Sequence, residues 1–223
     1  NPTGKVYSAE TLRGLAGILE RASERYGEPI YLLSDEAYNR IVFDGVEFHS
    51  PAEFYSHTLI AYSYGKTLLA PGQRIGYLAL SPRIPESDRE RLRQDVFLAQ
   101  LANAWSFPNA VLQRALPELE QLSFDTDRLQ RKRDRMVGAL REIGYSVHVP
   151  EGTFYLLFRS PLLDDRAFFE LLVAERIYCL PGAMFDMPGF LRISLTASDE
   201  MIDRALPGFE RALAAARARE VAG

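Results

Sequence analysis

The sequence predicts an α/β protein: a mainly parallel sheet with covering helices, followed by a smaller α+β domain. Two observations support this class. In the first third of the chain a helical pattern alternates with short apolar runs, as in a parallel sheet covered by helices. After Pro85 the pattern turns helical for a long stretch, and shorter strands and helices follow without any internal repeat. The predicted domains are residues 1–118 and 119–223.

In the first domain, Ser8 is expected to cap a helix that ends at Gly27. Apolar runs at residues 30–33, 58–62 and 75–80 predict short strands. The helix is predicted from apolar residues at helical spacing, namely Leu12, Leu15, Ala16, Leu19 and Ala22.

The rest of the chain is predicted to be mainly helical, with strands in its second half. Pro108 and Pro117 punctuate the segment after the first long helix, and Pro207 is expected to interrupt the last helix or to lie in its first turn. The predicted helices are 86–104, 126–143, 165–176 and one from about residue 199, with strands near Val147, Phe154, Tyr178 and Leu191.

Composition indicates a globular protein without the excess of basic residues that is typical of binding to nucleic acids or anionic membranes. The chain has 26 basic and 30 acidic residues, a net charge of −4, and 47% hydrophobic residues. Its densest basic cluster, residues 131–135, is interrupted by Asp134 and is expected to be a solvated helix face. The single cysteine, Cys179, cannot form an intrachain disulfide and is expected in the core.

No metal site and no membrane-spanning segment are expected. His49, His57 and His148 are scattered without metal-ligand spacing. No apolar run is long enough to span a bilayer, and no segment resembles a signal peptide. We therefore expect a cytoplasmic protein.

Lys66 is the most informative residue. It follows the apolar run 58–62, so its amine is expected at the end of a strand, where open α/β sheets place ligands. Ser63 lies three residues before it and Arg74 eight residues after it. A hydroxyl, an amine that attacks carbonyls when desolvated, and a guanidinium suit an amine-linked, phosphate-bearing cofactor. Pyridoxal phosphate (PLP) is the cofactor that this combination predicts.

Three further motifs carry polar groups. The chain opens on Asn1-Pro2-Thr3-Gly4, and proline makes a cis peptide accessible there. Asp35 and Tyr38 follow the apolar run 30–33, and Glu36 between them is expected to be a surface or helix-start charge. In residues 190–195, strand alternation is expected to bury Leu191, Ile193 and Leu195 and to place Arg192 on the opposite face.

Together these motifs resemble the C-terminal part of a fold-type I PLP enzyme of the class I/II aminotransferase family. The family pattern is serine, any residue, a small residue and lysine, then proline, glycine and arginine; Gly65 stands where many members have a second serine. The resemblance implies that residues 1–118 are the C-terminal part of the PLP-binding large domain. It also implies that the N-terminal half, with its phosphate-binding turn and ring-stacking aromatic, is missing.

The resemblance assigns a role to each polar group. Lys66 would form the aldimine with PLP and act as general base and acid. Arg192 would bind the substrate α-carboxylate. Two further segments, 150–155 and 181–185, resemble parts of the family's small domain near the substrate, the second a loop that closes over it. The remaining cofactor-binding residues would be Asp35 at the pyridine nitrogen, Asn1 and Tyr38 at the ring hydroxyl oxygen, and Ser63 and Arg74 at the phosphate.

Each motif alone also has a plain structural explanation: a surface lysine, a terminal turn, a helix cap for Asp35 and an edge-strand arginine. The combination favours an aminotransferase that acts on an amino acid and a 2-oxo acid and assembles as a homodimer. Three alternatives stay open: a carbon–sulfur lyase or related enzyme of this fold, the effector domain of an aminotransferase-like transcription regulator, and a PLP-binding scaffold without turnover.

Overall fold

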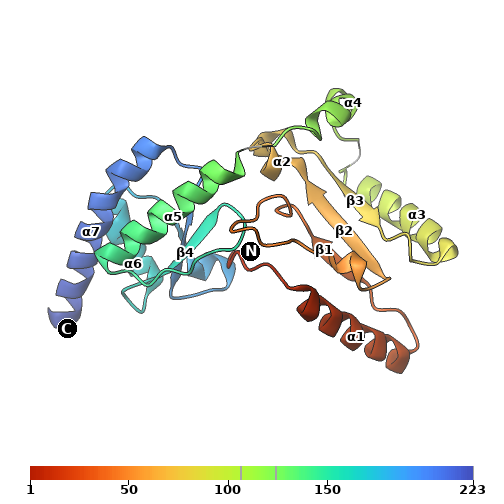
Figure 1. Cartoon of the computed structure of the whole chain (residues 1–223), viewed down its shortest axis with the longest axis horizontal. Helices are drawn as coiled ribbons and strands as arrows, with labels where there is room; N and C mark the ends of the chain where they lie inside the picture. The colour runs from red at the N-terminus through yellow and green to blue at the C-terminus, as the bar shows by residue number, and fades with distance from the viewer. Residues whose placement is uncertain (106, 124, 223) are drawn as a thin grey trace. The chain divides into compact units, whose positions relative to one another are not determined.

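The computed structural model describes residues 1–105, 107–123 and 125–222, which form two compact units (Figure 1). We name them by the residues of interest that they contain. The lysine unit comprises Tyr7–Arg40 and Glu47–Phe124. The arginine unit comprises Asn1–Val6, Ile41–Val46 and Asp125–Gly223. The division into domains at residues 118 and 119 stays a prediction.

The lysine unit begins with helix α1 (Ala9–Tyr26), and both predicted helix ends are confirmed. The Ser8 hydroxyl accepts a hydrogen bond from the Thr11 amide at 3.2 Å, and Gly27 ends the helix in the left-handed conformation, with φ of 73°. Leu12 and Ala16 are buried, so they form the centre of the predicted apolar face.

The sheet of this unit has the strand order β1–β2–β3. Strands β1 (Leu32–Asp35) and β2 (Thr58–Ser63) are parallel, as predicted, and β1 lies two residues further along the chain than expected. Strand β3 (Gly76–Leu80) pairs antiparallel with β2. An antiparallel edge strand on an otherwise parallel sheet is common in α/β folds. A 3₁₀ turn (Pro51–Glu53) precedes β2.

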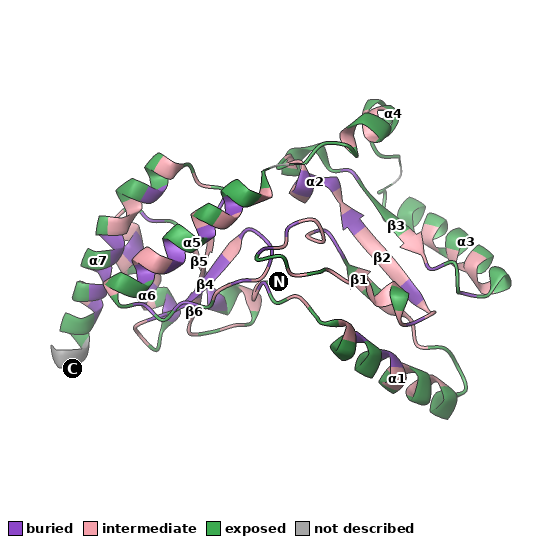
Figure 2. Ribbon diagram, viewed as in Figure 1, coloured by how far each residue is buried: buried purple, intermediate pink, exposed green. Residues whose placement is uncertain are grey.

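Two helices complete the lysine unit. Helix α3 (Glu86–Ala102) confirms the predicted helix, and Figure 2 shows it as exposed or half-buried along its length. Helix α4 (Ala110–Leu119) was not predicted. It starts because the Asn109 side chain accepts hydrogen bonds from the amides of Val111 and Leu112, and it contains Pro117.

The arginine unit packs three helices with an antiparallel sheet of strand order β4–β6–β5. Its core includes Tyr145, Phe158 and Phe209, which are buried and whose rings contact one another. The Tyr145 hydroxyl donates to the Phe209 carbonyl oxygen at 2.8 Å. The elements are α5 (Thr126–Ile143), β4 (Tyr155–Arg159), α6 (Asp165–Ala174), β5 (Leu180–Pro181), β6 (Phe190–Ser194) and α7 (Asp199–Ala222).

Three expectations for this unit need correction. Val147 forms only an isolated bridge with Phe158 rather than a strand. Pro207 lies inside the continuous helix α7, neither interrupting it nor in its first turn. The basic cluster on α5 is not wholly solvated, because Arg133 is 2% exposed. A buried guanidinium needs hydrogen-bond acceptors, and Asp44 and Pro150 supply them to Arg133.

Two short segments, residues 1–6 and 41–46, complete the arginine unit. The Gly4 carbonyl oxygen accepts hydrogen bonds from the amides of Glu151 at 2.9 Å and Gly152 at 3.0 Å. The Arg133 guanidinium donates to both carboxylate oxygens of Asp44, at 2.5 and 2.8 Å, and to the Pro150 carbonyl oxygen at 3.0 Å. These contacts attach both segments to the body of the unit.

Candidate active site

The polar residues predicted in the lysine unit collect at one edge of its sheet. Asp35 ends β1 and Ser63 ends β2, and because these strands are parallel their carboxyl ends meet at the same edge. Strand β3 starts at Gly76, opposite Ser63, so the segment that contains Arg74 returns to this edge. The ligand-binding edge of an α/β sheet therefore carries a carboxylate, a hydroxyl and a guanidinium.

Lys66 lies in α2 (Tyr64–Thr67), a single helical turn directly after β2. Its Nζ lies 5.4 Å from the centre of the Tyr38 ring, so the structure brings together two predicted site residues from different strand ends. A buried hydrogen bond holds this turn to the end of β2, because the hydroxyls of Tyr62 and Thr67 are 2.7 Å apart and both side chains are buried. The lysine is half-buried over this support.

The segment between Lys66 and β3 makes a tight return. A 3₁₀ turn (Pro71–Gln73) leads into it, and Leu69 and Arg74 each have φ of 49°, which is uncommon for residues with a side chain. Such strained backbone conformations cluster at functional sites. A Cβ at Gly65 would lie 3.2 Å from the Pro71 Cα, so the close approach of this segment favours glycine at position 65.

The donors and acceptors at this edge are accessible. Ser63 is the residue before α2, yet its hydroxyl makes no capping hydrogen bond to the part of the chain that is described. Arg74 is exposed and donates only a long hydrogen bond, 3.4 Å, to the Pro71 carbonyl oxygen. Asp35 is exposed, and its Oδ1 accepts from the Ala37 amide at 3.2 Å, closing a turn rather than capping a helix.

Glu36 is not the surface charge that the sequence suggested. It is 5% exposed, and its carboxylate accepts a hydrogen bond from the Ser50 hydroxyl at 2.6 Å. Its role is to attach the turn after β1 to the loop before the 3₁₀ turn at Pro51. Nothing in the local sequence signals this, because Ser50 lies fourteen residues away.

Arg192 lies on β6 in the arginine unit, on the face opposite the buried Leu191 and Leu195. Its guanidinium carbon is 4.1 Å from the centre of the Tyr155 ring and 5.1 Å from that of Phe185. Sequence reasoning placed both aromatics in segments near the substrate but did not predict this contact with the arginine. Stacking on aromatic faces orients a guanidinium without using its N–H donors.

Arg192 also differs from other arginines of this unit in its ion pairing. Arg133 and Arg211 in the same unit are paired with Asp44 and Glu175. By contrast, within residues 1–105, 107–123 and 125–222 no carboxylate forms an ion pair with Arg192. A guanidinium held by stacking can offer two parallel N–H donors to a carboxylate.

Asn1 belongs to the arginine unit, and the Asn1–Pro2 peptide is cis. The following turn is tight, since a Cβ at Gly4 would lie 2.4 Å from the Pro150 Cβ. The predicted site residues thus divide between the units: Asn1 and Arg192 lie in the arginine unit, and Asp35, Tyr38, Ser63, Lys66 and Arg74 lie in the lysine unit.

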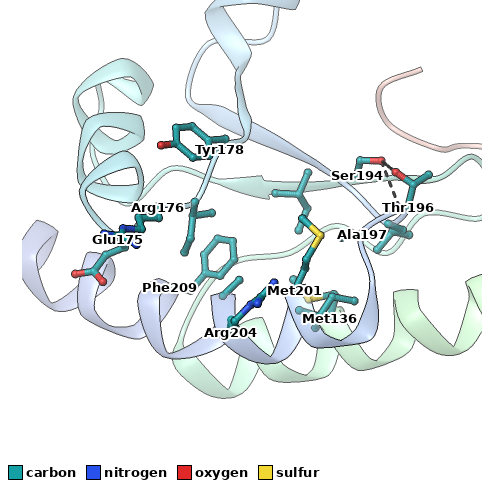
Figure 3. A pocket seen from close by; sticks show the side chains of 15 residues that line it. Met136, Glu175, Arg176, Tyr178, Ser194, Thr196, Ala197, Met201, Arg204 and Phe209 are labelled. Carbon is teal, nitrogen blue, oxygen red and sulfur yellow. Dashed lines mark hydrogen bonds between the residues drawn. The ribbon is translucent and has the colours of Figure 1, made fainter. Parts of the chain in front are cut away.

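A cavity of about 750 Å³ in the arginine unit is separate from these residues (Figure 3). Its lining includes Ile193, Ser194 and Leu195, at the end of β6 and just after it, but not Arg192. Helix α7 contributes Met201, Arg204 and Phe209. None of the predicted cofactor or substrate residues lines this cavity.

Among the residues that the structure describes, no group of three or more histidine, cysteine or acidic side chains is arranged to hold a metal ion. Of the helices that the structure describes, none combines the length and apolar character needed to cross a membrane.

Comparisons with known proteins agree on one family. The family model "Aminotransferase class I and II" matches residues 1–209. The aspartate aminotransferase of Thermotoga maritima is 32% identical over 216 residues, covering 94% of this chain and 53% of that protein. The probable aspartate aminotransferase of Methanocaldococcus jannaschii is 31% identical over 211 residues, covering 92% and 54%.

Solved structures lead to the same conclusion. An aminotransferase from Eubacterium rectale has a TM-score of 0.87 and 32% identity, covering 95% of this chain and 53% of that one. The Thermotoga maritima aspartate aminotransferase structure has a TM-score of 0.76 and 30% identity, covering 95% and 53%. These likenesses confirm the predicted fold class. The chain spans about half the length of the curated relatives it matches, and it belongs to the class I and II aminotransferase family.

Proposed function

We propose that the protein containing this chain is a PLP-dependent aminotransferase that transfers an amino group from an amino acid to a 2-oxo acid. The observation that carries this proposal is the position of Lys66 on a supported turn at the ligand-binding edge of the sheet, with its Nζ beside Tyr38. Relatives named as aspartate aminotransferases and aspartate/prephenate aminotransferases support transamination.

The residues of the lysine unit fit PLP, the cofactor of this family. One edge carries an amine, a hydroxyl, a guanidinium and a carboxylate, in Lys66, Ser63, Arg74 and Asp35. We propose that the hydroxyl and the guanidinium bind the phosphate and that the carboxylate pairs with the pyridinium nitrogen. When bound, PLP supplies a carbonyl carbon for an amine and a ring that accepts electrons from the substrate. Tyr38 and Asn1 are proposed to bind the ring hydroxyl oxygen.

Lys66 and Arg192 are proposed to act on the substrate. The Arg192 guanidinium binds the α-carboxylate through two parallel N–H donors, and this bidentate contact fixes the substrate's orientation. The Lys66 amine takes the proton from the substrate Cα as general base and, as general acid, would deliver it to the C4′ carbon of the cofactor in the same half-reaction. Lys66 is half-buried, and its Nζ lies 5.4 Å from the centre of the Tyr38 ring, so the amine is held at the edge of the sheet where this proton transfer is proposed.

The first experiment tests the lysine. PLP-loaded full-length protein is reduced with borohydride and digested, and the modified peptide is identified by mass spectrometry. The label is expected on Lys66, and Lys66→Ala should lose both the label and the visible absorbance of the linked cofactor. Lys5→Ala is the matched control, because Lys5 forms an ion pair with Glu151 in the other unit. Label retained by the Lys66→Ala protein would refute the assignment.

Product analysis tests the reaction type. Aspartate with 2-oxoglutarate is the first pair to assay, because the relatives' names include aspartate. A new oxo acid together with glutamate supports transfer. Pyruvate with ammonia and thiol from a sulfur-containing amino acid, without glutamate, would instead identify a carbon–sulfur lyase.

We also propose a cytoplasmic homodimer. The support is the resemblance to a family whose sites are usually built at a dimer interface. Sedimentation of the full-length protein should give twice the mass of one chain, and cell fractionation should recover it with cytoplasmic markers. A monomer that binds PLP and turns over at the same rate at all concentrations would contradict the dimer.

A further inference from the structure

Asp165, the first residue of α6, is a buried carboxylate without a role in the proposed reaction. It is 3% exposed, and its Oδ2 accepts hydrogen bonds from two amides, those of Ala183 at 3.1 Å and Gly189 at 2.9 Å. Hydrogen bonds to an ionised acceptor are stronger than neutral ones. A single oxygen atom therefore holds both ends of the loop formed by residues 183–189.

The loop between these two amides has little freedom of its own. The Met187 amide donates to the Gly182 carbonyl oxygen at 3.0 Å, and a Cβ at Gly182 would lie 1.9 Å from the Met187 carbonyl oxygen. Asp186 and Gly189 both have positive φ, 57° and 83°. The backbone thus closes on itself, and Asp165 fixes the closed loop to helix α6.

This loop carries one of the two rings that contact Arg192. Phe185 ends the 3₁₀ turn η3 (Gly182–Phe185), and its ring centre lies 5.1 Å from the Arg192 guanidinium carbon. The other ring, Tyr155, is fixed independently, because β4 pairs with β6 next to the arginine. One side of the stack thus depends on the sheet, and the other depends on the loop that Asp165 holds.

We propose that Asp165 is a positioning residue for carboxylate recognition: by fixing the 183–189 loop it sets the place of the Phe185 ring, and through it the plane of the Arg192 guanidinium. This inference rests on the proposed function of Arg192. A bidentate contact with a carboxylate depends on the orientation of the guanidinium plane. Ordering one loosened side chain at binding weakens affinity by roughly three- to tenfold.

Asp165→Ala is the main variant, and Asp164→Ala is its matched control. Asp164 is the neighbouring residue and caps the same helix by accepting from the Arg166 amide at 2.9 Å, but it is exposed and holds no loop amide. If loss of a helix cap were the whole effect, both variants would behave alike. Asp165→Asn keeps an acceptor oxygen and should recover part of the loss.

The assay is the dissociation constant of maleate, a dicarboxylate that cannot react, for the PLP-loaded full-length protein. We expect Asp165→Ala to weaken maleate binding three- to tenfold, to raise the KM for the amino acid similarly, and to change kcat less than twofold. Hydrogen exchange of the peptide spanning residues 182–190 should accelerate in this variant only. Unchanged maleate affinity with an accelerated loop would overturn the inference.

Two further variants separate the possible failures. Arg192→Lys should weaken maleate binding more than any other change; if it does not, the proposed role of Arg192 is wrong, whatever Asp165 does. Phe185→Leu removes the ring while leaving the Asp165 hydrogen bonds in place. It therefore tests whether the ring orients the Arg192 guanidinium, even if Asp165→Ala does not fold. Normal maleate affinity in Phe185→Leu, with weakened affinity in Arg192→Lys, would overturn the positioning inference alone.

Discussion

Replacing Arg133 with methionine should destabilise the arginine unit strongly. The Arg133 side chain is 3% exposed, and it donates to Asp44, to Asp134 at 2.8 Å and to the Pro150 carbonyl oxygen at 3.0 Å. Methionine keeps the apolar stem and removes the donors. Hydrogen bonds to charged groups contribute about 1.5–3 kcal/mol each, but water can replace the arginine at the half-exposed carboxylates. We therefore expect a loss of roughly 2–3 kcal/mol.

The assay is hydrogen exchange of peptides from α5, which reports on this unit rather than on the whole protein. A loss of 2–3 kcal/mol corresponds to a fall in amide protection of roughly 30- to 140-fold. Arg131→Met on the same helix is the control: this side chain is 69% exposed and lies 3.9 Å from Asp125, so its removal should cost under about 0.5 kcal/mol. Equal losses in the two variants would refute the reasoning.

The pH dependence gives a second check. The hydrogen bond from Arg133 holds the pKa of Asp44 below its ordinary value of 3.8. A carboxylate whose pKa is lowered by folding contributes stability above its unfolded pKa, and loses it as the pH falls through the lowered value. Asp44→Asn should therefore be less protected than the natural protein at about pH 6, with the difference shrinking towards about pH 2. A difference that stays constant across this range would contradict the ion pair.

Three further outcomes follow from local contacts. Gly76→Ala should lower the free energy of unfolding in urea by about 3 kcal/mol, because the new Cβ would lie 2.2 Å from the Tyr62 carbonyl oxygen. Gly72→Ala is the control and should leave that free energy nearly unchanged, because the space around Gly72 is open. Thr67→Val removes the partner of the buried Tyr62 hydroxyl and should cost about 1–2 kcal/mol, whereas Thr67→Ser should restore most of it. Burial raises the pKa of the Cys179 thiol to about 12, so at pH 8 a thiol reagent should label it far more slowly in the folded than in the urea-unfolded protein; equal rates would contradict this.

Local signals explain what could be predicted from the sequence. The ends of α1 and α5 follow from caps and glycines beside them, namely Ser8, Gly27, Asp125 and Gly144. Lys66 was found because its supporting groups lie within a few residues of it. Helix α4 is not predicted because Pro117 within it and Pro108 just before it suggest irregular structure, whereas the Asn109 cap decides its start.

Contacts between residues distant in the sequence explain what could not. The burial of Glu36 depends on Ser50, and the burial of Arg133 depends on Asp44 and Pro150. The stack of Tyr155 and Phe185 on Arg192 joins two strands and a loop, and no spacing in the sequence encodes it. Alternation predicted the face of Arg192 but not what holds its guanidinium in place.

The three-part make-up of the arginine unit has a consequence for how the chain folds during synthesis. Residues 1–6 and 41–46 are synthesised well before their hydrogen-bond partners at residues 133 and 150–152. Pairings between such distant segments form slowly, because a long loop must close first. We expect these two segments to stay unpaired while the lysine unit folds. The hydrogen bonds of Gly4 and Asp44 should therefore form late in folding. Expression of residues 125–223 alone would leave Arg133 and the amides of Glu151 and Gly152 without those partners.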